Sequence, residues 1–515
     1  MRVAGNVSLS NLSNVWLVGL AAGAVAGACT YKNTQHCQFG GTVCGADEYC
    51  DICRDDFKGC FPLSDDPDPA CVFQPGMGTE TGPTSGPETE TGPGTETSTG
   101  PGTSMGSSTT QGGGCMGDGA CGGATPYCEG GVCVGCVEAG GDGYCAGKGG
   151  VGEVCDEGSG ACVECLPGKS EACEGATPVC DEETKTCRGC EGSEECGMGV
   201  ACAWESGRCL SSGVVYVDGG NGGCSDQNAG TEGEPLCTVG AGVQKVSSGG
   251  TVVVKGGGPD YQEDVVVGGG KEVGMLGVGG PVLQGNVAEG LRVTTGATVY
   301  VEGVTFSGGG SDGVSCNGAT LHVRGVVVKL NAGRGVVASG CEVTVRQTEV
   351  SSNSGGGVDA SDSMLLLENT FITQNGNGGT SPGIRATGGT LDVRYVTVAG
   401  NIASGADSLQ CMGGFTGDVR NSLLFGLSTD SVNCAGAAFA GNASDTDLGG
   451  GNVNEGPIQQ SWFTDFNAGD FHLAPGHPFG GVATWKDGDP LVDYDGDARP
   501  GMDGAADVAG ADVPQ

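Results

Sequence analysis

The phrase Val301-Glu302-Gly303-Val304-Thr305-Phe306 returns three times along the chain at a constant spacing of 22 residues. Each copy alternates apolar and polar residues, as is typical of short β-strands with one buried face. A phrase that recurs at a fixed period indicates one structural unit per repeat, stacked on the next. The aligned copies are Val323-Arg324-Gly325-Val326-Val327-Val328, Val345-Arg346-Gln347-Thr348-Glu349-Val350, Leu367-Glu368-Asn369-Thr370-Phe371-Ile372 and, at spacings of 26 residues, Val393-Arg394-Tyr395-Val396-Thr397-Val398 and Val419-Arg420-Asn421-Ser422-Leu423-Leu424.

A second phrase, which begins with glycine, accompanies the first in each repeat. Asparagine also occupies one position per coil, where it tolerates left-handed backbone and can hydrogen-bond to its own column. Each coil therefore holds several short strands separated by tight turns. The glycine phrases are Gly290-Leu291-Arg292, Gly313-Val314-Ser315, Gly335-Val336-Val337, Gly357-Val358-Asp359 and Gly383-Ile384-Arg385, and the asparagines are Asn331, Asn353, Asn375 and Asn401.

This organisation resembles the right-handed parallel β-helix of the pectin-lyase-like proteins. The resemblance covers roughly residues 213–445. It implies an all-β fold for these residues, and the sequence before them is expected to form small disulfide-rich modules and a disordered linker. A β-sandwich is the alternative, but its strands would not repeat one phrase so strictly.

Both ends of a stack of coils need covering, because the terminal coils would otherwise expose the core. The segments around Val215–Asp218, Val239–Val246 and Thr251–Val254 resemble the beginning of many bacterial surface β-helices, in which a short helix plugs the core. Residues 446–515 are expected to form a terminal region that caps the last coil. Its aromatic residues are Trp462, Phe463, Phe466, Phe471, Phe479, Trp485 and Tyr494.

The composition restricts the class of protein. The 515 residues include 62 acidic and 22 basic side chains, for a formal net charge of −40, which argues against nucleic acid as a partner. The 107 glycines and 5% aromatic residues favour stacked repeats, linkers and small stapled modules over one large core. The 29 cysteines, beside only four histidines, indicate disulfides formed in an oxidising compartment.

Residues 115–212 hold sixteen cysteines that form four tandem units of four, and we expect a solvated, semi-rigid stalk. Zinc is the competing interpretation of the C-x-x-C spacings, but export and the absence of histidine favour disulfides. The sequence leaves the connectivity open. The units are Cys115, Cys121, Cys128, Cys133; Cys136, Cys145, Cys155, Cys162; Cys165, Cys173, Cys180, Cys187; and Cys190, Cys196, Cys202, Cys209.

The N-terminal part contains three further segments. Residues 1–28 read as a signal peptide, because an apolar run of eleven residues is too short to span a bilayer. Residues 29–75 form a six-cysteine module too small to fold by apolar burial alone. Residues 76–114 repeat Thr-Gly-Pro and Glu-Thr phrases and are expected to be a disordered linker.

The small residues before Cys29 resemble the lipobox of bacterial lipoproteins, in which the cysteine is acylated and becomes the mature N-terminus. Ala26 stands where that family prefers leucine, and Ala26-Gly27-Ala28 also fits an ordinary signal peptidase site. If Cys29 is acylated, 28 cysteines remain, an even number that can all form disulfides. It implies a bacterial envelope or outer-membrane lipoprotein attached to the membrane by its N-terminal lipid, whereas the second implies an extracellular protein.

Candidates for metal binding are few. Asp493, Asp495 and Asp497 have the spacing of a calcium loop, so calcium is the one cofactor that the sequence offers. A structural turn in which Arg499 neutralises these acids is the alternative. His472 and His477 have no Cys, His or Glu at metal-ligand spacing, and surface or packing roles are expected for both.

Catalytic β-helices need paired carboxylates, or calcium-binding aspartates with a basic residue, on one sheet. In the column after the Gly-Val phrases the only acid is Asp359, and Arg385 follows it on the next coil. This pair is a weak catalytic candidate, and a salt bridge between coils is the alternative. The other outward columns alternate in charge, as expected of a solvated sheet face.

The sequence therefore favours a cell-surface or secreted β-helix protein with a structural or ligand-binding role, the ligand being an acidic polysaccharide or a cell-surface glycan. A polysaccharide lyase or glycoside hydrolase is the alternative. The ligand surface is expected beside the two long turns 375–382 and 401–407, with Arg385, Arg394 and Arg420 as binding residues.

The remaining cysteines suggest three pairs within the helix, Cys224 with Cys237, Cys316 with Cys341 and Cys411 with Cys434. The last two separations are close to one coil. Each such bridge is expected to contribute about 2–4 kcal/mol by restricting the unfolded chain.

If Cys29 is lipidated, intact-mass analysis of the membrane fraction will find a mature chain that begins at this residue and carries the added lipid. A water-soluble product with an unmodified Cys29 would contradict this expectation.

Overall fold

The computed structural model describes residues 48–50, 60–62, 118–148, 152–167, 169, 173–376, 381–403, 407–427 and 430–514. The predicted signal peptide, Cys29 and the linker lie outside the described residues. Of the six-cysteine module, β1 (Glu48–Cys50) and β2 (Cys60–Pro62) are described, and they pair antiparallel. No helix among the described residues is long and apolar enough to cross a membrane.

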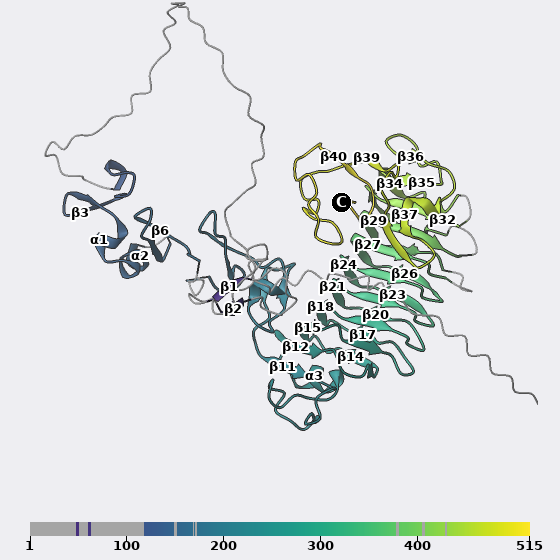
Figure 1. Cartoon of the computed structure of the whole chain (residues 1–515), viewed down its shortest axis with the longest axis horizontal. Coiled ribbons are helices and arrows are strands. Elements are labelled where there is room, and N and C mark those ends of the chain that lie inside the picture. The colour runs from purple at the N-terminus through teal and green to yellow at the C-terminus, as the bar shows by residue number, and fades with distance from the viewer. Residues whose placement is uncertain are drawn as a thin grey trace, which may run out of the picture. The chain divides into compact units, whose positions relative to one another are not determined.

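The C-terminal half is a parallel β-helix, as the repeat predicted (Figure 1). One coil consists of β17 (Leu291–Thr294), β18 (Thr298–Glu302) and β19 (Thr305–Ser307), and the next of β20 (Val314–Asn317), β21 (Thr320–Arg324) and β22 (Val327–Lys329). Equivalent residues pair in parallel, for example Glu302 with Arg324. The helix therefore has three strand positions per coil, here called first, second and third.

The first strands form an eight-stranded sheet, and the second and third strands form an eighteen-stranded sheet. The eight-stranded sheet also contains β14 (Val265–Val267), β23 (Arg334–Ser339), β26 (Gly356–Ser361), β28 (Ile384–Thr387), β30 (Leu409–Met412) and β33 (Val432–Asn433). The other sheet contains β11 (Val214–Val217), β12 (Gly250–Lys255), β13 (Tyr261–Gln262), β15 (Glu272–Val278), β16 (Val282–Gln284), β24 (Glu342–Arg346), β25 (Glu349–Ser351), β27 (Met364–Thr373), β29 (Thr390–Asn401), β31 (Thr416–Arg420), β32 (Leu423–Gly426), β34 (Ala437–Ala440), β35 (Ala443–Ser444) and β36 (Val453–Asn454).

The asparagine column is a continuous ladder inside the helix, as predicted. Asn353 is fully buried, and its Oδ1 accepts two hydrogen bonds from Asn331, one from the backbone N–H at 3.1 Å and one from the side-chain Nδ2 at 2.9 Å. Its Nδ2 donates to the carbonyl of Val328 at 2.9 Å and to Oδ1 of Asn375 at 3.0 Å. Each amide thus satisfies buried backbone groups of the turn and also bonds to the next coil.

The left-handed backbone at this turn falls on the residue before each asparagine, not on the asparagine itself. Leu330, Ser352 and Gln374 have φ values of 57°, 55° and 54°. The asparagine is needed for its side-chain amide, whereas the preceding position must bend the chain. A left-handed non-glycine residue costs roughly 1–2 kcal/mol, which the ladder beside it offsets.

The N-terminal end of the helix is plugged by α3 (Val239–Lys245), as expected. Val239 and Val243 are buried in the core of the helix. Thr238 caps the first turn through its hydroxyl, and the carboxylate of Glu263 accepts hydrogen bonds from the backbone N–H groups of Val239 and Gly240, both at 2.7 Å. These bonds satisfy N–H groups that a helix start leaves unpaired.

The C-terminal aromatic residues cover the side of the late coils. Trp462, Phe471 and Phe479 share a buried cluster with outward residues of the third strands, Phe371 of β27 and Phe425 of β32. The equivalent positions of earlier coils hold smaller or polar side chains, Thr305, Val327 and Glu349 in place of Phe371. The covering region contains η6 (Gln460–Trp462), β37 (Phe463–Asp465), β38 (Asp470–Leu473), β39 (Gly480–Thr484) and β40 (Ala506–Val508).

The cysteine-rich segment consists of small disulfide-linked units. In units two to four the first cysteine bonds to the third and the second to the fourth, and in unit one Cys121 bonds to Cys133. Their elements are η3 (Asp118–Ala120), β3 (Tyr127–Glu129), β4 (Val132–Val134), α1 (Cys136–Ala139), α2 (Asp142–Lys148), β5 (Val154–Asp156), β6 (Ala161–Val163), β7 (Val179–Cys180), β8 (Cys187–Arg188), η5 (Ser193–Cys196), β9 (Cys202–Ala203) and β10 (Arg208–Cys209).

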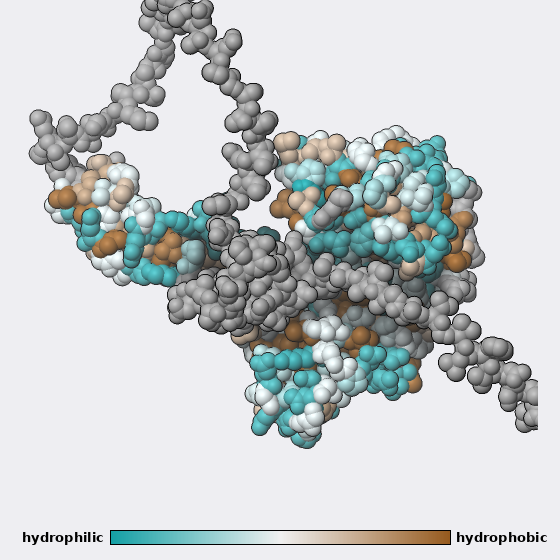
Figure 2. Space-filling model, viewed as in Figure 1, coloured by the Kyte–Doolittle hydropathy of each residue, from teal (hydrophilic) through white to brown (hydrophobic). Residues whose placement is uncertain are grey.

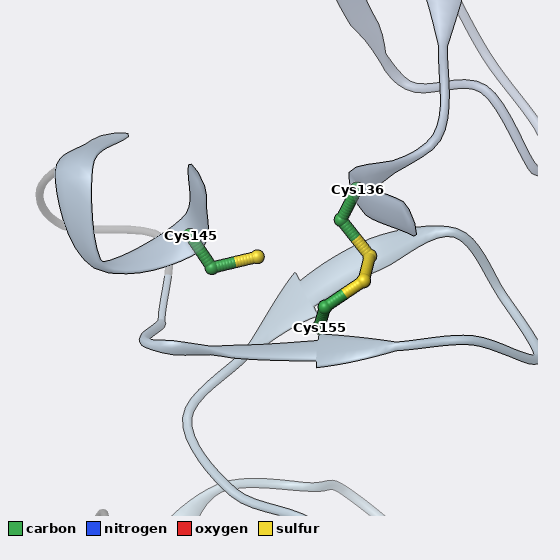
Figure 3. A group of neighbouring side chains, drawn as sticks. All are labelled: Cys136, Cys145 and Cys155. Atoms are coloured by element: carbon green, nitrogen blue, oxygen red, sulfur yellow. A yellow bond between two sulfur atoms is a disulfide. The ribbon is translucent and has the colours of Figure 1, made fainter. Parts of the chain in front are cut away.

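The sulfur atoms of Cys136, Cys145 and Cys155 lie within 4.8 Å of one another, close enough for a metal site. Figure 3 shows that two of them form a disulfide, Cys136 with Cys155. Cys145 is bonded to Cys162. The oxidised form therefore leaves no thiolate in this group for zinc. Within the β-helix the bonded pairs are Cys224–Cys237, Cys316–Cys341 and Cys411–Cys434.

Replacing Asn353 with alanine should lower the free energy of unfolding by about 3 kcal/mol or more. The change removes side-chain hydrogen bonds on both sides and leaves buried backbone groups unpaired, each at about 1–3 kcal/mol. Urea unfolding followed by circular dichroism measures the effect. The control is Asn317→Ala, an exposed position of the same helix, which should change the midpoint little. Equal effects in the two variants would contradict the role of the ladder.

Candidate functional site

The fourth cysteine repeat packs on the outer face of the second strands and is not a solvated stalk unit, contrary to the expectation. Ala201, Ala203 and Leu210 are buried together with Tyr300 of β18. The backbone N–H of Ala201 donates to Oγ1 of Thr251 at 2.9 Å, and that hydroxyl donates to the carbonyl of Leu210 at 2.9 Å. The apolar residues of this repeat explain the contact, because they remove themselves and the sheet face from water.

Aromatic stacking continues this contact onto the next coil. Trp204 meets Tyr300 edge-on at 5.3 Å between ring centroids, and Tyr300 stacks on His322 of β21 at 4.7 Å. His322 is 2% exposed, and its burial, together with the nearby charge of Arg346, lowers its pKa to about 4. The imidazole is therefore neutral at physiological pH.

Polar contacts extend along the same edge. Arg208 forms an ion pair with Glu272 at 2.8 Å, and Arg346 of β24 forms one with Glu205 at 3.4 Å. Ser193 of the repeat donates its hydroxyl to the carboxylate of Glu302. The repeat thus contacts five successive second strands, β12, β15, β18, β21 and β24, the contact with β21 being that of Trp204 with His322 at 6.2 Å between ring centroids.

The C-terminal region approaches the same face from the other side through the bends between the second and third strands. Gln347 donates to the carbonyl of Asp493 at 3.0 Å, Asn369 to that of Val492 at 2.7 Å, and Asn421 to that of Thr484 at 3.0 Å. Arg499 lies over the ring of Tyr395, 3.9 Å from its centroid. The four residues of the helix in these contacts, Gln347, Asn369, Tyr395 and Asn421, occupy the same bend position on successive coils.

Between the two coverings lies an open depression that we call the lateral groove. It consists of three hollows of about 430, 310 and 240 Å³, of which the smallest shares Asp392 and Asp418 with the first and Arg394 with the second. Trp204 and Glu205 of the fourth repeat line one side, and Lys486 and residues 488–490 of the C-terminal region line the other. The groove runs across strands of successive coils, so equivalent side chains recur about every 4.8 Å along it.

Arginines and carboxylates alternate in the groove. Arg394 pairs with Asp392 through Nε and Oδ1 at 2.9 Å, and Arg420 pairs with the buried carboxylate of Asp489. Arg346 lies 3.3 Å from Glu368, whose pKa is raised by burial. Fixed planar guanidinium and carboxylate groups can donate and accept hydrogen bonds in pairs, an arrangement suited to sugar hydroxyls and carboxylates.

The structure separates the three arginines predicted as ligand residues. Arg394 and Arg420 are neighbours on β29 and β31 and line the groove. Arg385 lies on β28 of the other sheet, where it pairs with Asp359. Residues 377–380 and 404–406 of the long turns lie outside the described residues.

Asp359 and Arg385, the weak catalytic candidates, form part of a chain of salt bridges across coils. Asp359 is 4% exposed and accepts a hydrogen bond from Nη1 of Arg334 at 2.8 Å as well as from Nε of Arg385 at 3.1 Å. Arg334 also pairs with Asp312 at 2.9 Å. Both carboxylates thus have strong cationic partners, an arrangement that favours the structural alternative.

Two of the residues predicted to bind calcium turn to different partners. The side chain of Asp493 is buried and accepts hydrogen bonds from the backbone N–H groups of Asp495, Asp497 and Val513 at 2.8–2.9 Å. Asp495 faces His472 instead, at 3.0 Å from Nε2. These contacts favour a turn held by Asp493, and calcium binding at the three acids stays a prediction.

The two histidines differ. His477 accepts a hydrogen bond from the backbone N–H of Phe479 at 3.1 Å and stacks on that ring, in keeping with a packing role. His472 has carboxylate neighbours in space, Asp470 and Asp495. Sequence spacing missed the second of these because it comes from a separate segment.

Comparisons with known proteins match different parts of the chain. Residues 102–215 match a family of unknown function (DUF8331), a range that includes the cysteine repeats. No curated protein matches the chain.

Among solved structures, the pectate lyase Pel9A is similar at 14% identity over 58% of this chain and 96% of its own, with a TM-score of 0.35. The GH136 lacto-N-biosidase from Eubacterium ramulus is similar at 10% identity over 45% and 60%, with a TM-score of 0.27. The alginate lyase from Paenibacillus sp. str. FPU-7 is similar at 13% identity over 40% and 83%, with a TM-score of 0.22. Function is therefore inferred from the groove itself.

Acidification should lower the free energy of unfolding because His322 is buried in its neutral form. Its folded pKa of about 4 lies below the ordinary value of 6.5, so the unfolded chain takes up the proton first. The free energy of unfolding is therefore highest above pH 6.5 and falls as the pH drops towards 4, with a loss of about 2 kcal/mol at pH 5. His322→Phe should remove this part of the pH dependence, measured as the unfolding free energy between pH 7 and 5.

The matched control is Tyr300→Phe, which keeps the stacked ring and removes no group that titrates in this range. It should keep the pH dependence of the unchanged chain. An unaltered slope in His322→Phe would mean that His322 is hydrated and charged in the folded protein.

Proposed function

We propose that the protein is an exported bacterial surface protein that binds a glycan in the lateral groove. The observation that carries the proposal is the groove itself, elongated across successive coils and lined by alternating arginines and carboxylates. A linear polymer with regularly spaced hydroxyl groups matches such a surface. The disulfides support export, because such bonds persist in oxidising compartments.

Charged and aromatic side chains lie together in the lining of the lateral groove. Figure 2 shows hydrophobic residues interspersed among hydrophilic ones on the described surface. Trp204 adds an aromatic ring to the groove lining. A ring beside planar hydrogen-bonding groups is suited to a sugar, which has both apolar C–H faces and hydroxyl edges.

The proposed attachment to the membrane is a lipid on Cys29. The six-cysteine module (29–75), the linker (76–114) and the cysteine repeats (115–212) lie between this residue and the β-helix (213–445) in the sequence. The fourth repeat then serves two purposes. It ends the cysteine-rich part of the chain, and it forms one wall of the groove. Residues 446–515 form the other wall.

A polysaccharide lyase or hydrolase is the second candidate. The observation that favours it is Glu368, whose pKa is raised by burial and which faces the groove between Arg346 and Arg394. A carboxyl group with a raised pKa can act as a general acid or base. Release of shortened or unsaturated oligosaccharides by the unchanged chain would establish this activity.

Binding should depend on Arg394. After a glycan array of neutral and uronic-acid oligosaccharides identifies a ligand, isothermal titration should show that Arg394→Ala weakens binding at least about tenfold, because a hydrogen bond to a charged group contributes about 1.5–3 kcal/mol. Arg394→Lys keeps the charge but not the planar fork and should give an intermediate loss.

The control is Arg292→Ala, which removes the same charge from the eight-stranded sheet, where Arg292 pairs with Glu289 at 3.1 Å. Its affinity should equal that of the unchanged chain. Equal losses in Arg292→Ala and Arg394→Ala would mean that net charge alone governs binding, and the groove would not be the site.

A further inference from the structure

Four acidic and imidazole groups from three separate segments meet in the C-terminal region. His472 and Asp470 lie on β38, Asp495 lies in the turn that follows Asp493, and Asp512 lies in the C-terminal tail. The ligand atoms of His472, Asp495 and Asp512 all lie within 4.8 Å of one another. The cluster lies outside the lateral groove and has no part in the function proposed above.

The imidazole is oriented from one side. Its Nδ1 lies 2.6 Å from Oδ1 of Asp470, and its ring packs edge-on against Phe371, 5.0 Å between centroids. A hydrogen bond from Nδ1 to a carboxylate leaves Nε2 with its lone pair directed to the other side. Metal-binding histidines commonly have this carboxylate behind them.

The other nitrogen faces the carboxylate of Asp495. Nε2 of His472 is inaccessible to solvent and lies 3.0 Å from Oδ2 of Asp495, but this contact does not have the geometry of a hydrogen bond. The separation is close to the roughly 3.3 Å expected between two ligands at about 2.0–2.1 Å from one tetrahedral metal ion. A metal ion between the two atoms would bind the lone pair of this nitrogen and the carboxylate together.

The charge of the cluster also favours a cation. Asp512 is 5% exposed and accepts a hydrogen bond from the backbone N–H of Leu473 at 2.5 Å. Three carboxylates, those of Asp470, Asp495 and Asp512, therefore surround one imidazole, and a divalent ion would balance their charge.

We propose that His472, Asp495 and Asp512 bind a divalent transition-metal ion, with Asp470 orienting the imidazole. An imidazole nitrogen with two carboxylates is a ligand set for zinc and its first-row neighbours. Calcium prefers oxygen ligands throughout, so the predicted acid loop contributes Asp495 to a different kind of site. The ion joins β38, the turn at Asp495 and the tail at Asp512, and so fastens the C-terminal region over Phe371.

Zinc is the probe. The full chain, without an affinity tag and with its thiols shown to be oxidised, is dialysed against buffered zinc, and the bound metal is measured by mass spectrometry. His472→Gln and Asp495→Asn should each lower zinc affinity at least tenfold, and Asp495→Asn changes a side chain that is half-exposed. His477→Gln, a histidine of the same region outside the cluster, should bind zinc as the unchanged chain does.

Thermal unfolding gives a second readout. Zinc should raise the midpoint of the unchanged chain and of His477→Gln, but not that of His472→Gln. Zinc binding that is equal in His472→Gln and the unchanged chain, or absent from the unchanged chain, would overturn the proposal. Calcium binding that depends on Asp495 but not on His472 would also overturn it and would place the ion in the acid loop.

Discussion

The parallel hydrogen bonds between successive coils are the constraint on which the rest of the structure depends. They place equivalent residues about 4.8 Å apart, so one position of the repeat becomes a continuous column on the molecule. The buried asparagines show this inside the helix, where Asn331, Asn353, Asn375 and Asn401 bond in series. On the outside of the helix, the same constraint aligns one position of every repeat in a surface column. The residues chosen at that position therefore determine the character of a whole strip of surface.

The bend between the second and third strands shows how such a column changes function along the helix. In the early coils this left-handed position is Gly303 and Gly325, which accept the bend freely and offer no side chain. In later coils Gln347, Asn369, Tyr395 and Asn421 adopt the same conformation at some cost. Their side chains hold the C-terminal region, so the strain is offset by contacts that glycine cannot make.

The coil period, the strands and the inward residues could be predicted because they depend on local alternation and on a repeat visible in one chain. The asparagine ladder followed from the same reasoning, whereas its left-handed residue was misplaced by one position. The docking of Trp204 on Tyr300 could not be predicted, because it depends on surfaces from two unrelated segments.

A signal for the side covering was nevertheless present in the sequence. The outward third-strand positions change from Thr305, Val327 and Glu349 to Phe371, and later to Leu423 and Phe425. A sheet face that turns apolar requires a partner. The C-terminal aromatic residues are that partner, and reading these two observations together would have placed them on the side of the helix.

The lining of the groove restricts the ligand more closely than the charge of the whole chain does. A formal charge of −40 would repel a polyanion at long range, but salt screens such fields beyond about 8 Å at physiological ionic strength. Within the groove, Arg394 and Arg420 each have a carboxylate partner, so little uncompensated positive charge remains. A densely charged polymer would have to displace these partners. A glycan with many hydroxyls and isolated carboxylates could instead bond to both members of each pair, and this class of ligand fits the groove best.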